Sequence, residues 1–260
     1  MEIIVAAIFF LLGISVGSFL NVVADRVPAG ESLLRPPSHC FSCGHLLEPR
    51  DLFPIVSYLL LRGKCQYCGK TIPMRSVLVE LASGLLFVMA LTIFGLSWQT
   101  LSAIIFGSLF IVLFLTDLER GLLPHVIVYP GTATALVFAA LRPLTGTTPG
   151  LLSSLAGLGV GYGIFLIIWA VPRMFKKDII GFGDVGIAGL IGASVGYPTA
   201  LVALSIGILA GGLAAAMLAL FKVKKLSEPL QFGMFLAFGG MMALFCGQDI
   251  VDALRQLLTL

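Results

Sequence analysis

Charged residues are scarce in this 260-residue chain. Asp, Glu, Lys and Arg make up 11% of it and hydrophobic residues 58%, whereas an ordinary soluble domain carries about 25% charged residues. So little charge, with a mean hydropathy of +1.07, argues against one large soluble core and favours several membrane spans. The net charge is only +3, and the basic residues do not gather on one predicted face. This argues against a nucleic-acid-binding surface.

No basic residue precedes the first long hydrophobic run, from Ile3 to Ala24. A cleavable secretory signal has a basic start, a shorter apolar core and a small-residue cleavage site. The sequence therefore predicts a retained first span. It also lacks internal repeats and low-complexity tracts.

Hydrophobic windows of about 20 residues are long enough to cross a bilayer as helices, which satisfy their own backbone hydrogen bonds. We predict an all-α polytopic membrane protein with about eight transmembrane helices. They cover roughly residues 3–24, 77–97, 100–116, 125–142, 150–171, 180–197, 199–221 and 231–254.

The basic residues predict the orientation of these spans. With the N-terminus outside, 14 of the 16 Lys and Arg residues fall in inside loops, and only Arg142 and Arg255 lie outside. Basic residues prefer cytoplasmic loops. We therefore expect the polar segment 25–76 to be cytoplasmic. The inside residues are Arg26, Arg35, Arg50, Arg62, Lys64, Lys70, Arg75, Arg120, Arg173, Lys176, Lys177, Lys222, Lys224 and Lys225.

Four of the five cysteines lie in the segment 25–76, in two C-x-x-C pairs separated by 21 residues: Cys40, Cys43, Cys65 and Cys68. Such pairs are typical of a four-thiolate zinc site, and a reducing cytoplasm disfavours disulfides. Gly44 and Gly69 follow the two pairs, where tight turns need positive φ. We predict a small zinc-binding domain in which zinc is structural, because four protein ligands leave no position open for water. A redox pair or unpaired thiols are the alternatives.

The remaining candidate ligands in this part of the sequence are weaker. His39 and His45 flank the first cysteine pair and could compete for the metal, but four thiolates suffice. Cys246 lies in an apolar stretch, where a cysteine behaves as a small hydrophobic residue.

Two aspartates lie where apolar spans should exclude charge. Asp117 ends the third predicted span, and Asp184 begins the sixth within Gly181-Phe-Gly183-Asp184. The predicted topology places both near the cytoplasmic side. Ionisable residues inside spans are costly and usually functional. Asp117 could instead be a helix-end charge paired with Arg120.

Two carboxyl groups that meet can share one proton, so that one acts as a base and the other as an acid. The base would activate a water that attacks a peptide carbonyl, and the acid would protonate the carbonyl oxygen or the leaving nitrogen. Gly181 and Gly183 would let a substrate backbone approach, or would let the span begin irregularly. The two residues that we expect to catalyse are Asp117 and Asp184.

These motifs together resemble the type IV prepilin peptidases, a family of bifunctional leader peptidases and N-methyltransferases. The resemblance covers nearly the whole chain. It includes Gly17-Ser-Phe-Leu-Asn21-Val, both cysteine pairs, Pro54-Ile-Val-Ser57, Leu61-Arg62-Gly63-Lys64-Cys65, Arg75, Val79-Glu80-Leu81, Asp117-Leu-Glu119 to Leu123-Pro124, Lys177 to Asp184, and Pro229-Leu-Gln-Phe232-Gly233.

The resemblance implies a bacterial inner-membrane enzyme that cuts the short basic leader from prepilins or pseudopilins, after glycine and usually before phenylalanine. It implies Asp117 and Asp184 as the catalytic pair and the four cysteines as zinc ligands. The new N-terminus would then be methylated with S-adenosylmethionine. The implied domains are a first transmembrane helix (1–24), a cytoplasmic zinc-binding domain (25–76) and a seven-helix aspartyl peptidase domain (77–260).

The sequence departs from the family pattern at Glu119, His125, Ile180 and Gln231. Asp117 rather than Glu119 aligns with the first acid of the motif. No glycine-rich cofactor loop of a familiar kind marks the methyl-donor site. The cytoplasmic loop and the stretch from Glu80 to Gly84 are the candidates, with Glu80 and Gly84 as the residues to test.

Three other functions fit parts of the pattern. A related Gly-x-Gly-Asp peptidase could act on another substrate. An ion-coupled transporter could use Asp117 and Asp184 as cation sites, although the sequence lacks the paired halves that are common in transporters. A zinc-dependent membrane scaffold would not need the buried acids.

Overall fold

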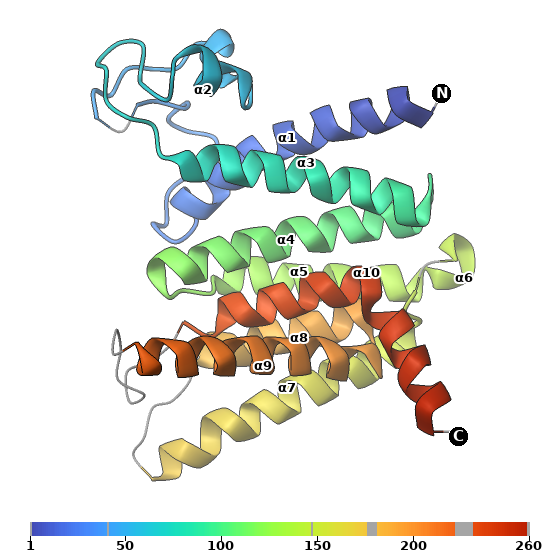
Figure 1. Cartoon of the computed structure of the whole chain (residues 1–260). Helices are drawn as coiled ribbons and strands as arrows, with labels where there is room; N and C mark the ends of the chain where they lie inside the picture. Colours follow the sequence, from blue (N-terminus) through green and yellow to red (C-terminus); the bar gives the residue numbers. More distant parts are fainter. Residues whose placement is uncertain (1, 41, 147, 176–180, 222–230, 259–260) are drawn as a thin grey trace. The chain divides into compact units, whose positions relative to one another are not determined.

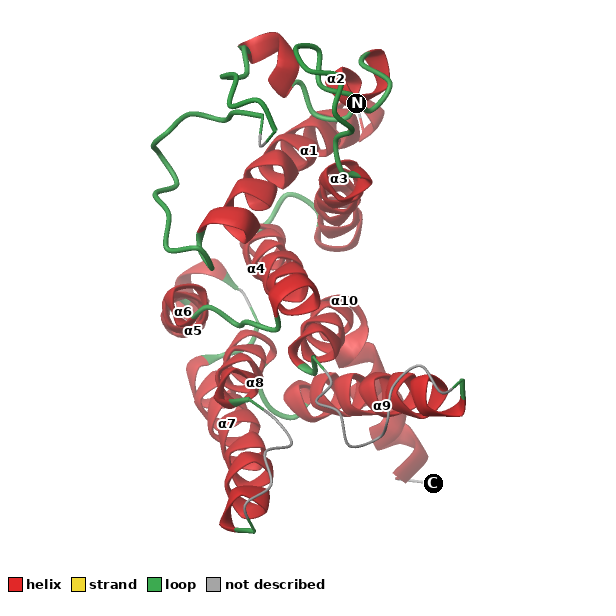
Figure 2. Cartoon of the chain, turned by 90° about the vertical axis from the view of Figure 1, so that its left-hand side faces the viewer, coloured by secondary structure: helices red, strands yellow, loops and turns green. Residues whose placement is uncertain are grey.

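The computed structural model describes residues 2–40, 42–146, 148–175, 181–221 and 231–258. Helices and loops form all of this described part, with no strand beyond isolated bridges (Figure 2). The chain divides into two compact units, Met1–Leu96 and Ser97–Leu260. Several residues named above lie outside the described ranges: Lys176, Lys177, Ile180, Lys222, Lys224, Lys225 and Pro229.

The first unit contains two long apolar helices, α1 (Glu2–Arg26) and α3 (Met74–Phe94), which pack along each other (Figure 1). The segment between them holds the short helices η1 (Pro49–Leu52) and α2 (Val56–Leu60). A Cβ atom at Gly13 would lie 2.7 Å from the Cα of Gly84, and one at Gly17 would lie 2.7 Å from the Cα of Glu80. Small residues therefore allow α1 and α3 to approach closely, as is usual between membrane helices.

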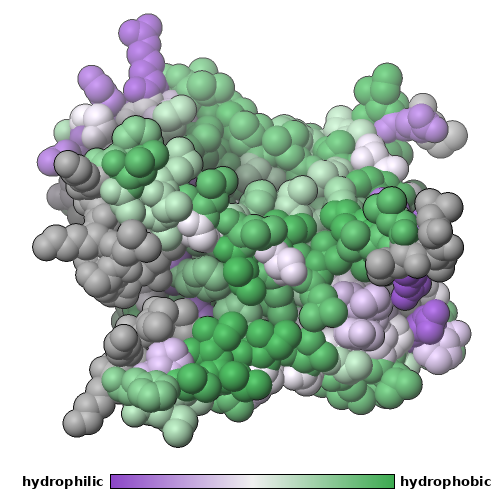
Figure 3. Space-filling model, turned by 60° about the horizontal axis from the view of Figure 1, so that its bottom comes forward, coloured by the Kyte–Doolittle hydropathy of each residue, from purple (hydrophilic) through white to green (hydrophobic). Residues whose placement is uncertain are grey.

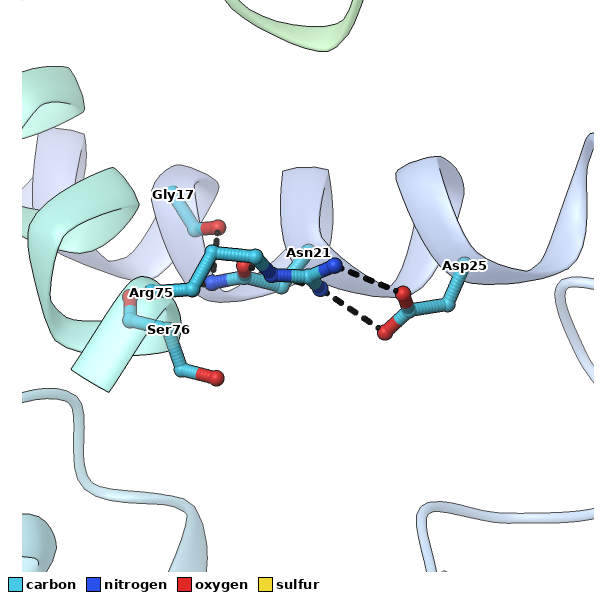
Figure 4. Close-up of polar contacts among 5 residues, drawn as sticks. All are labelled: Gly17, Asn21, Asp25, Arg75 and Ser76. Atoms are coloured by element: carbon cyan, nitrogen blue, oxygen red, sulfur yellow. Dashed lines mark hydrogen bonds and ion pairs between the residues drawn. The ribbon is translucent and has the colours of Figure 1, made fainter. Parts of the chain in front are cut away.

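Polar contacts join the loop-side ends of these two helices (Figure 4). Arg75 donates two hydrogen bonds of 2.9 Å to the carboxylate of Asp25, in the bidentate geometry that guanidinium groups favour. The side-chain amide of Asn21 donates to the carbonyl oxygens of Gly17 and Ser76 at 3.3 Å and 3.1 Å. These contacts connect the last turns of α1 to the first turn of α3.

The second unit contains seven helices in its described residues. They are α4 (Trp98–Arg120), α5 (His125–Ala140), α6 (Arg142–Thr145), α7 (Leu151–Met174), α8 (Phe182–Val195), α9 (Thr199–Leu220) and α10 (Gly233–Leu258). Helix α8 packs against α5, α7, α9 and α10, and every residue from Asp184 to Ser194 is buried. Gly157 and Gly161 of α7 lie directly against the backbone of α8 at Gly192 and Ala188.

The predicted all-α architecture is confirmed, because each of the eight predicted spans falls on a helix. Within the described ranges, six helices are long and apolar enough to cross a membrane: α1, α3, α4, α7, α9 and α10. Helices α5 and α8 are apolar but shorter. The fourteen residues of α8 span about 21 Å, which is shorter than the hydrocarbon core of about 30 Å. Four other helices enclose α8, so other parts of the protein surround it. Hydrophobic side chains cover most of the face drawn in Figure 3, as expected of a surface in contact with lipid.

Candidate functional site

Asp117 lies on the last turn of α4, and its side chain is only 4% exposed. Helix α4 ends at Arg120, and Gly121 adopts the left-handed conformation with φ of 61°. The N–H groups of Gly121 and Leu122 then donate to carbonyl oxygens of the last helical turn, a common way to end a helix. This tight turn returns the chain toward Asp117.

The carboxylate of Asp117 accepts a hydrogen bond of 2.7 Å from the backbone N–H of Met234. Met234 lies in the first turn of α10, where backbone N–H groups have no partner within the helix. Asp117 thus caps a helix that begins more than a hundred residues later. The positive end of the helix dipole stabilises a negative charge at this position.

Asp184 is similarly placed at a helix start. It is the third residue of α8, 6% exposed, and its carboxylate accepts a hydrogen bond of 3.0 Å from the N–H of Gly181. The N–H of Asp184 donates to the carbonyl oxygen of Gly181 at 3.2 Å. Gly181 takes part in this reciprocal pair through its backbone alone.

Leu123 connects the surroundings of the two aspartates. A Cβ atom at Gly183 would lie 3.0 Å from the Cβ of Leu123, and one at Gly233 would lie 2.6 Å from its Cδ1. The Cβ position of Gly233 is also 3.1 Å from the carboxyl carbon of Asp117. The starts of α8 and α10 and the end of α4 therefore meet around one leucine.

Both aspartates that the sequence selected are buried, and both lie near Leu123. Glu119 is exposed, whereas Asp117 is buried. The space beside Gly183 is occupied by Leu123, so a substrate backbone can lie there only if Leu123 moves. Sequence reasoning missed the roles of Leu123, Gly233 and the N–H of Met234. The motif that contains Phe232 and Gly233 is part of the family resemblance, but its residue types do not predict a contact with Asp117.

The four loop cysteines form a second cluster. Their sulfur atoms all lie within 4.8 Å of one another, and those of Cys40 and Cys68 are 3.8 Å apart. None of the four forms a disulfide. The described residues hold no other group of three or more His, Cys, Asp or Glu side chains suited to a metal. The cluster can hold a metal ion.

Two similar turns build this cluster. In the first, the N–H of Cys40 donates to His45 and the N–H of Gly44 donates to Cys40. In the second, Cys65 donates to Lys70 and Gly69 donates to Cys65. Gly44 and Gly69 have φ of 70° and 71°, which glycine adopts without strain and other residues do not.

The pKa values of two thiols in the cluster are shifted in opposite directions. Hydrogen bonds from the backbone of Ser42 and Cys43 lower the pKa of Cys40 to about 6. Cys68 accepts from the backbone of Lys70, yet partial desolvation and hydrogen bonds with the three neighbouring thiols raise its pKa to about 11. A cation would displace the shared protons, since thiolates rather than thiols bind metals.

The two residues suggested for a cofactor have other contacts. Gly84 packs against Phe10 and Ile14 of α1, each within 3 Å of its Cβ position. The buried carboxylate of Glu80 accepts a hydrogen bond of 2.7 Å from the N–H of Ile55. Gly84 thus serves the packing of α1 on α3, and Glu80 connects α3 to the loop.

Comparison with known families divides the chain as the structure does. Residues 11–94 match the bacterial peptidase A24 N-terminal domain, and residues 104–216 match the type IV leader peptidase family. The first match contains the four cysteines, and the second contains both buried aspartates.

Individual relatives match over longer stretches. The chain is 33% identical over 272 residues to a prepilin leader peptidase/N-methyltransferase of Burkholderia pseudomallei, covering 93% of this chain and 85% of that protein. It is 32% identical over 273 residues to one of Pseudomonas aeruginosa, covering 95% and 92%. A Myxococcus xanthus protein of the same name is 36% identical over 189 residues, covering 72% of this chain but 55% of that protein. No solved structure matches the chain.

Proposed function

This chain belongs to the type IV leader peptidase family, and we propose that it cleaves prepilins or pseudopilins with Asp117 and Asp184 as the catalytic pair. The observation that supports the proposal is that two buried carboxylates, on the last turn of α4 and the first turn of α8, both lie near Leu123. Their separation along the sequence makes this meeting a product of the fold. Buried acids of this kind on membrane helices are usually functional.

The local geometry supports a division of labour between the two acids. Asp184 accepts one backbone hydrogen bond, from Gly181, whereas Asp117 accepts from both Met234 and Gly233. The two oxygens of a carboxylate together offer about four lone-pair sites, so each acid can still hold or accept a proton. One acid would take a proton from the attacking water and the other would protonate the leaving amine, as in other aspartyl peptidases.

We propose that this site faces the cytoplasm of a bacterium, at its inner membrane. The support is the distribution of Lys and Arg, which predicts cytoplasmic loops at the end of α4, at the start of α8 and over residues 25–76. A basic leader resists transfer across the membrane. A peptidase that faces the cytoplasm meets the leader where it is retained.

Zinc is the metal that we propose for the four cysteines. Tetrahedral zinc binds each thiolate at about 2.3 Å, which separates its sulfurs by about 3.8 Å. The sulfurs of Cys40 and Cys68 already lie at 3.8 Å, and the other two are near enough to complete the shell. Such a metal would stabilise the fold of a loop that has little core of its own.

Methylation of the new N-terminus with S-adenosylmethionine is the second proposed activity, supported by the name that the relatives share. We expect the methyl donor to bind the first unit, the part that matches the A24 N-terminal domain. Glu80 and Gly84 remain the sequence-based candidates, although their present contacts favour structural roles.

One assay tests the proposed function. Purified protein in lipid vesicles is mixed with a prepilin, and the mass of the mature product is measured with and without S-adenosylmethionine. We expect loss of the basic leader in both cases and a gain of one methyl group only with the donor. An intact prepilin would contradict the peptidase assignment. Glu119→Gln is the matched control. Because Glu119 is exposed, we expect this variant to retain cleavage.

A further inference from the structure

Part of the cysteine loop has a hydrophobic surface that the first unit leaves uncovered. Between Leu52 and Leu60, five large apolar side chains are exposed, and Phe53 and Leu60 are exposed by 63% and 78%. The five are Leu52, Phe53, Val56, Leu59 and Leu60. We call Leu52–Leu60 the apolar loop segment. So many exposed apolar residues in nine positions mark a contact surface.

A buried carboxylate fixes the depth of this segment. The N–H of Ile55 donates to Glu80 on α3 at 2.7 Å, and Ser18 of α1 hydrogen-bonds the same carboxylate. Glu80 lies six residues past Met74, the first residue of α3. At 1.5 Å per residue, the Cα of Glu80 is about 9 Å along the span from its start, and Ile55 is held within the reach of the Glu80 side chain.

The first turns of α3 also expose apolar side chains. Met74, Leu78 and Leu81 are exposed large hydrophobic residues of the first turns of this helix. Along the span, the apolar loop segment and these exposed side chains of α3 therefore lie at similar levels, near the boundary between headgroups and acyl chains. Interfacial segments bury their apolar side chains about 5–10 Å deep at this boundary.

Several backbone N–H groups of the apolar loop segment have partners within the protein, as a place with little water requires. Ile55 donates to Glu80, Val56 to Pro54, and Ser57 to Phe53. Leu59 donates to Ile55 at 3.0 Å, and Pro54 has no N–H to satisfy. Unpaired backbone groups are costly near the hydrocarbon region, and a loop entering it needs internal partners of this kind.

The turn at Ile55 is strained, which indicates that Glu80 maintains it. Ile55 has φ of 61° and ψ of −48°, and the N–H of Val56 reaches the carbonyl of Pro54 at 2.6 Å. This is a γ-turn with positive φ, which is rare and unfavourable for a β-branched residue. Such strain persists where surrounding contacts hold it. The hydrogen bond to Glu80 is one of these contacts.

Charge at the end of the segment favours lipid over another hydrophobic partner. Arg62 and Lys64 follow α2 and are both exposed. Basic residues beside an interfacial apolar segment attract anionic phosphate groups.

We propose that the apolar loop segment lies in the bilayer interface, with phospholipid as its partner and Glu80 as the residue that positions it there. The proposal does not depend on the peptidase activity. It makes the cysteine loop a membrane-bound element rather than one that extends freely into the cytoplasm.

Photocrosslinking in lipid vesicles tests this placement. Leu60 is replaced with benzoylphenylalanine, and the full chain is reconstituted in phosphatidylethanolamine and phosphatidylglycerol and irradiated. The matched control carries the same replacement at Leu46, which is 54% exposed in the first cysteine turn. We expect phospholipid adducts several-fold more abundant from position 60 than from position 46.

Three results would overturn the proposal: no lipid adduct at position 60, equal adducts at both positions, or a crosslinked dimer of the chain at position 60. The role of Glu80 is tested in the same assay. Glu80→Leu should lower the adduct yield at position 60 several-fold, whereas Glu80→Gln should retain it, because the amide oxygen still accepts from Ile55. An unchanged yield with Glu80→Leu would remove Glu80 from the proposal.

Discussion

The cysteine cluster and the aspartate pair are assembled in different ways. Each cysteine pair is closed by a local turn, in which Gly44 and Gly69 donate back to Cys40 and Cys65. Asp117, in contrast, is bound to Met234, and the two are 117 residues apart. A locally built site depends on its own few residues. A site built across helices depends on packing throughout its unit.

The strongest test of this contrast is removal of a metal ligand. Cys65→Ser should lose most of the bound metal and expose the loop to protease, because three thiolates hold a structural metal poorly and the loop has little other core. Metal content by mass spectrometry and limited proteolysis measure the two effects. We expect methylation to fall more than cleavage.

Cys246→Ser is the control for this variant, since Cys246 lies on α10 outside the cluster. It should leave metal content unchanged. Equal loss of metal in both variants, or equal loss of methylation and cleavage in Cys65→Ser, would contradict a locally built site.

A smaller effect is expected at the helix start beside Asp117. Gly233→Ala places a Cβ atom 2.6 Å from Leu123 and 3.1 Å from the Asp117 carboxyl carbon. Overpacking of this kind costs about 1–3 kcal/mol. Thermal unfolding in detergent should show the loss of stability, and cleavage should fall because the carboxylate is displaced.

Gly212→Ala is the matched control, as no atom lies within 4 Å of its Cβ position on α9. It should unfold at the wild-type temperature or slightly above, because alanine favours helices more than glycine does. Equal behaviour of the two variants would show that the contact of Gly233 with Leu123 has no energetic weight.

The smallest effect is expected for Arg75→Lys. Lysine keeps the charge but cannot form the two parallel hydrogen bonds to Asp25. Both side chains are about one quarter exposed, and partly exposed ion pairs contribute about 0.2–1 kcal/mol. A loss of stability much larger than this would mean that the pair controls the entry of the loop into α3.

The sequence was sufficient to predict the features that short-range chemistry controls. Long apolar runs predicted eight helices, and C-x-x-C spacing predicted that Cys40 and Cys65 would share one site. It also predicted functional roles for Asp117 and Asp184, because a carboxylate in an apolar span is energetically costly and is usually functional.

Other features depended on contacts that no local pattern encodes. Neither Leu123 nor Met234 differs from an ordinary apolar residue until α4, α8 and α10 are placed together. The turn at Ile55 goes against local preference, because a β-branched residue rarely adopts positive φ. It exists because Glu80, 25 residues later, accepts its N–H.

The most direct test of the central claim compares Asp117→Asn, Asp184→Asn and the double variant for cleavage of a prepilin. Asparagine can still accept the hydrogen bonds from Met234 and Gly181, so the helix caps should persist while the proton chemistry is lost. If the two acids act as a unit, each single variant should lose as much activity as the double variant, since such effects are not additive. A folded single variant that cleaves near the wild-type rate would contradict the account.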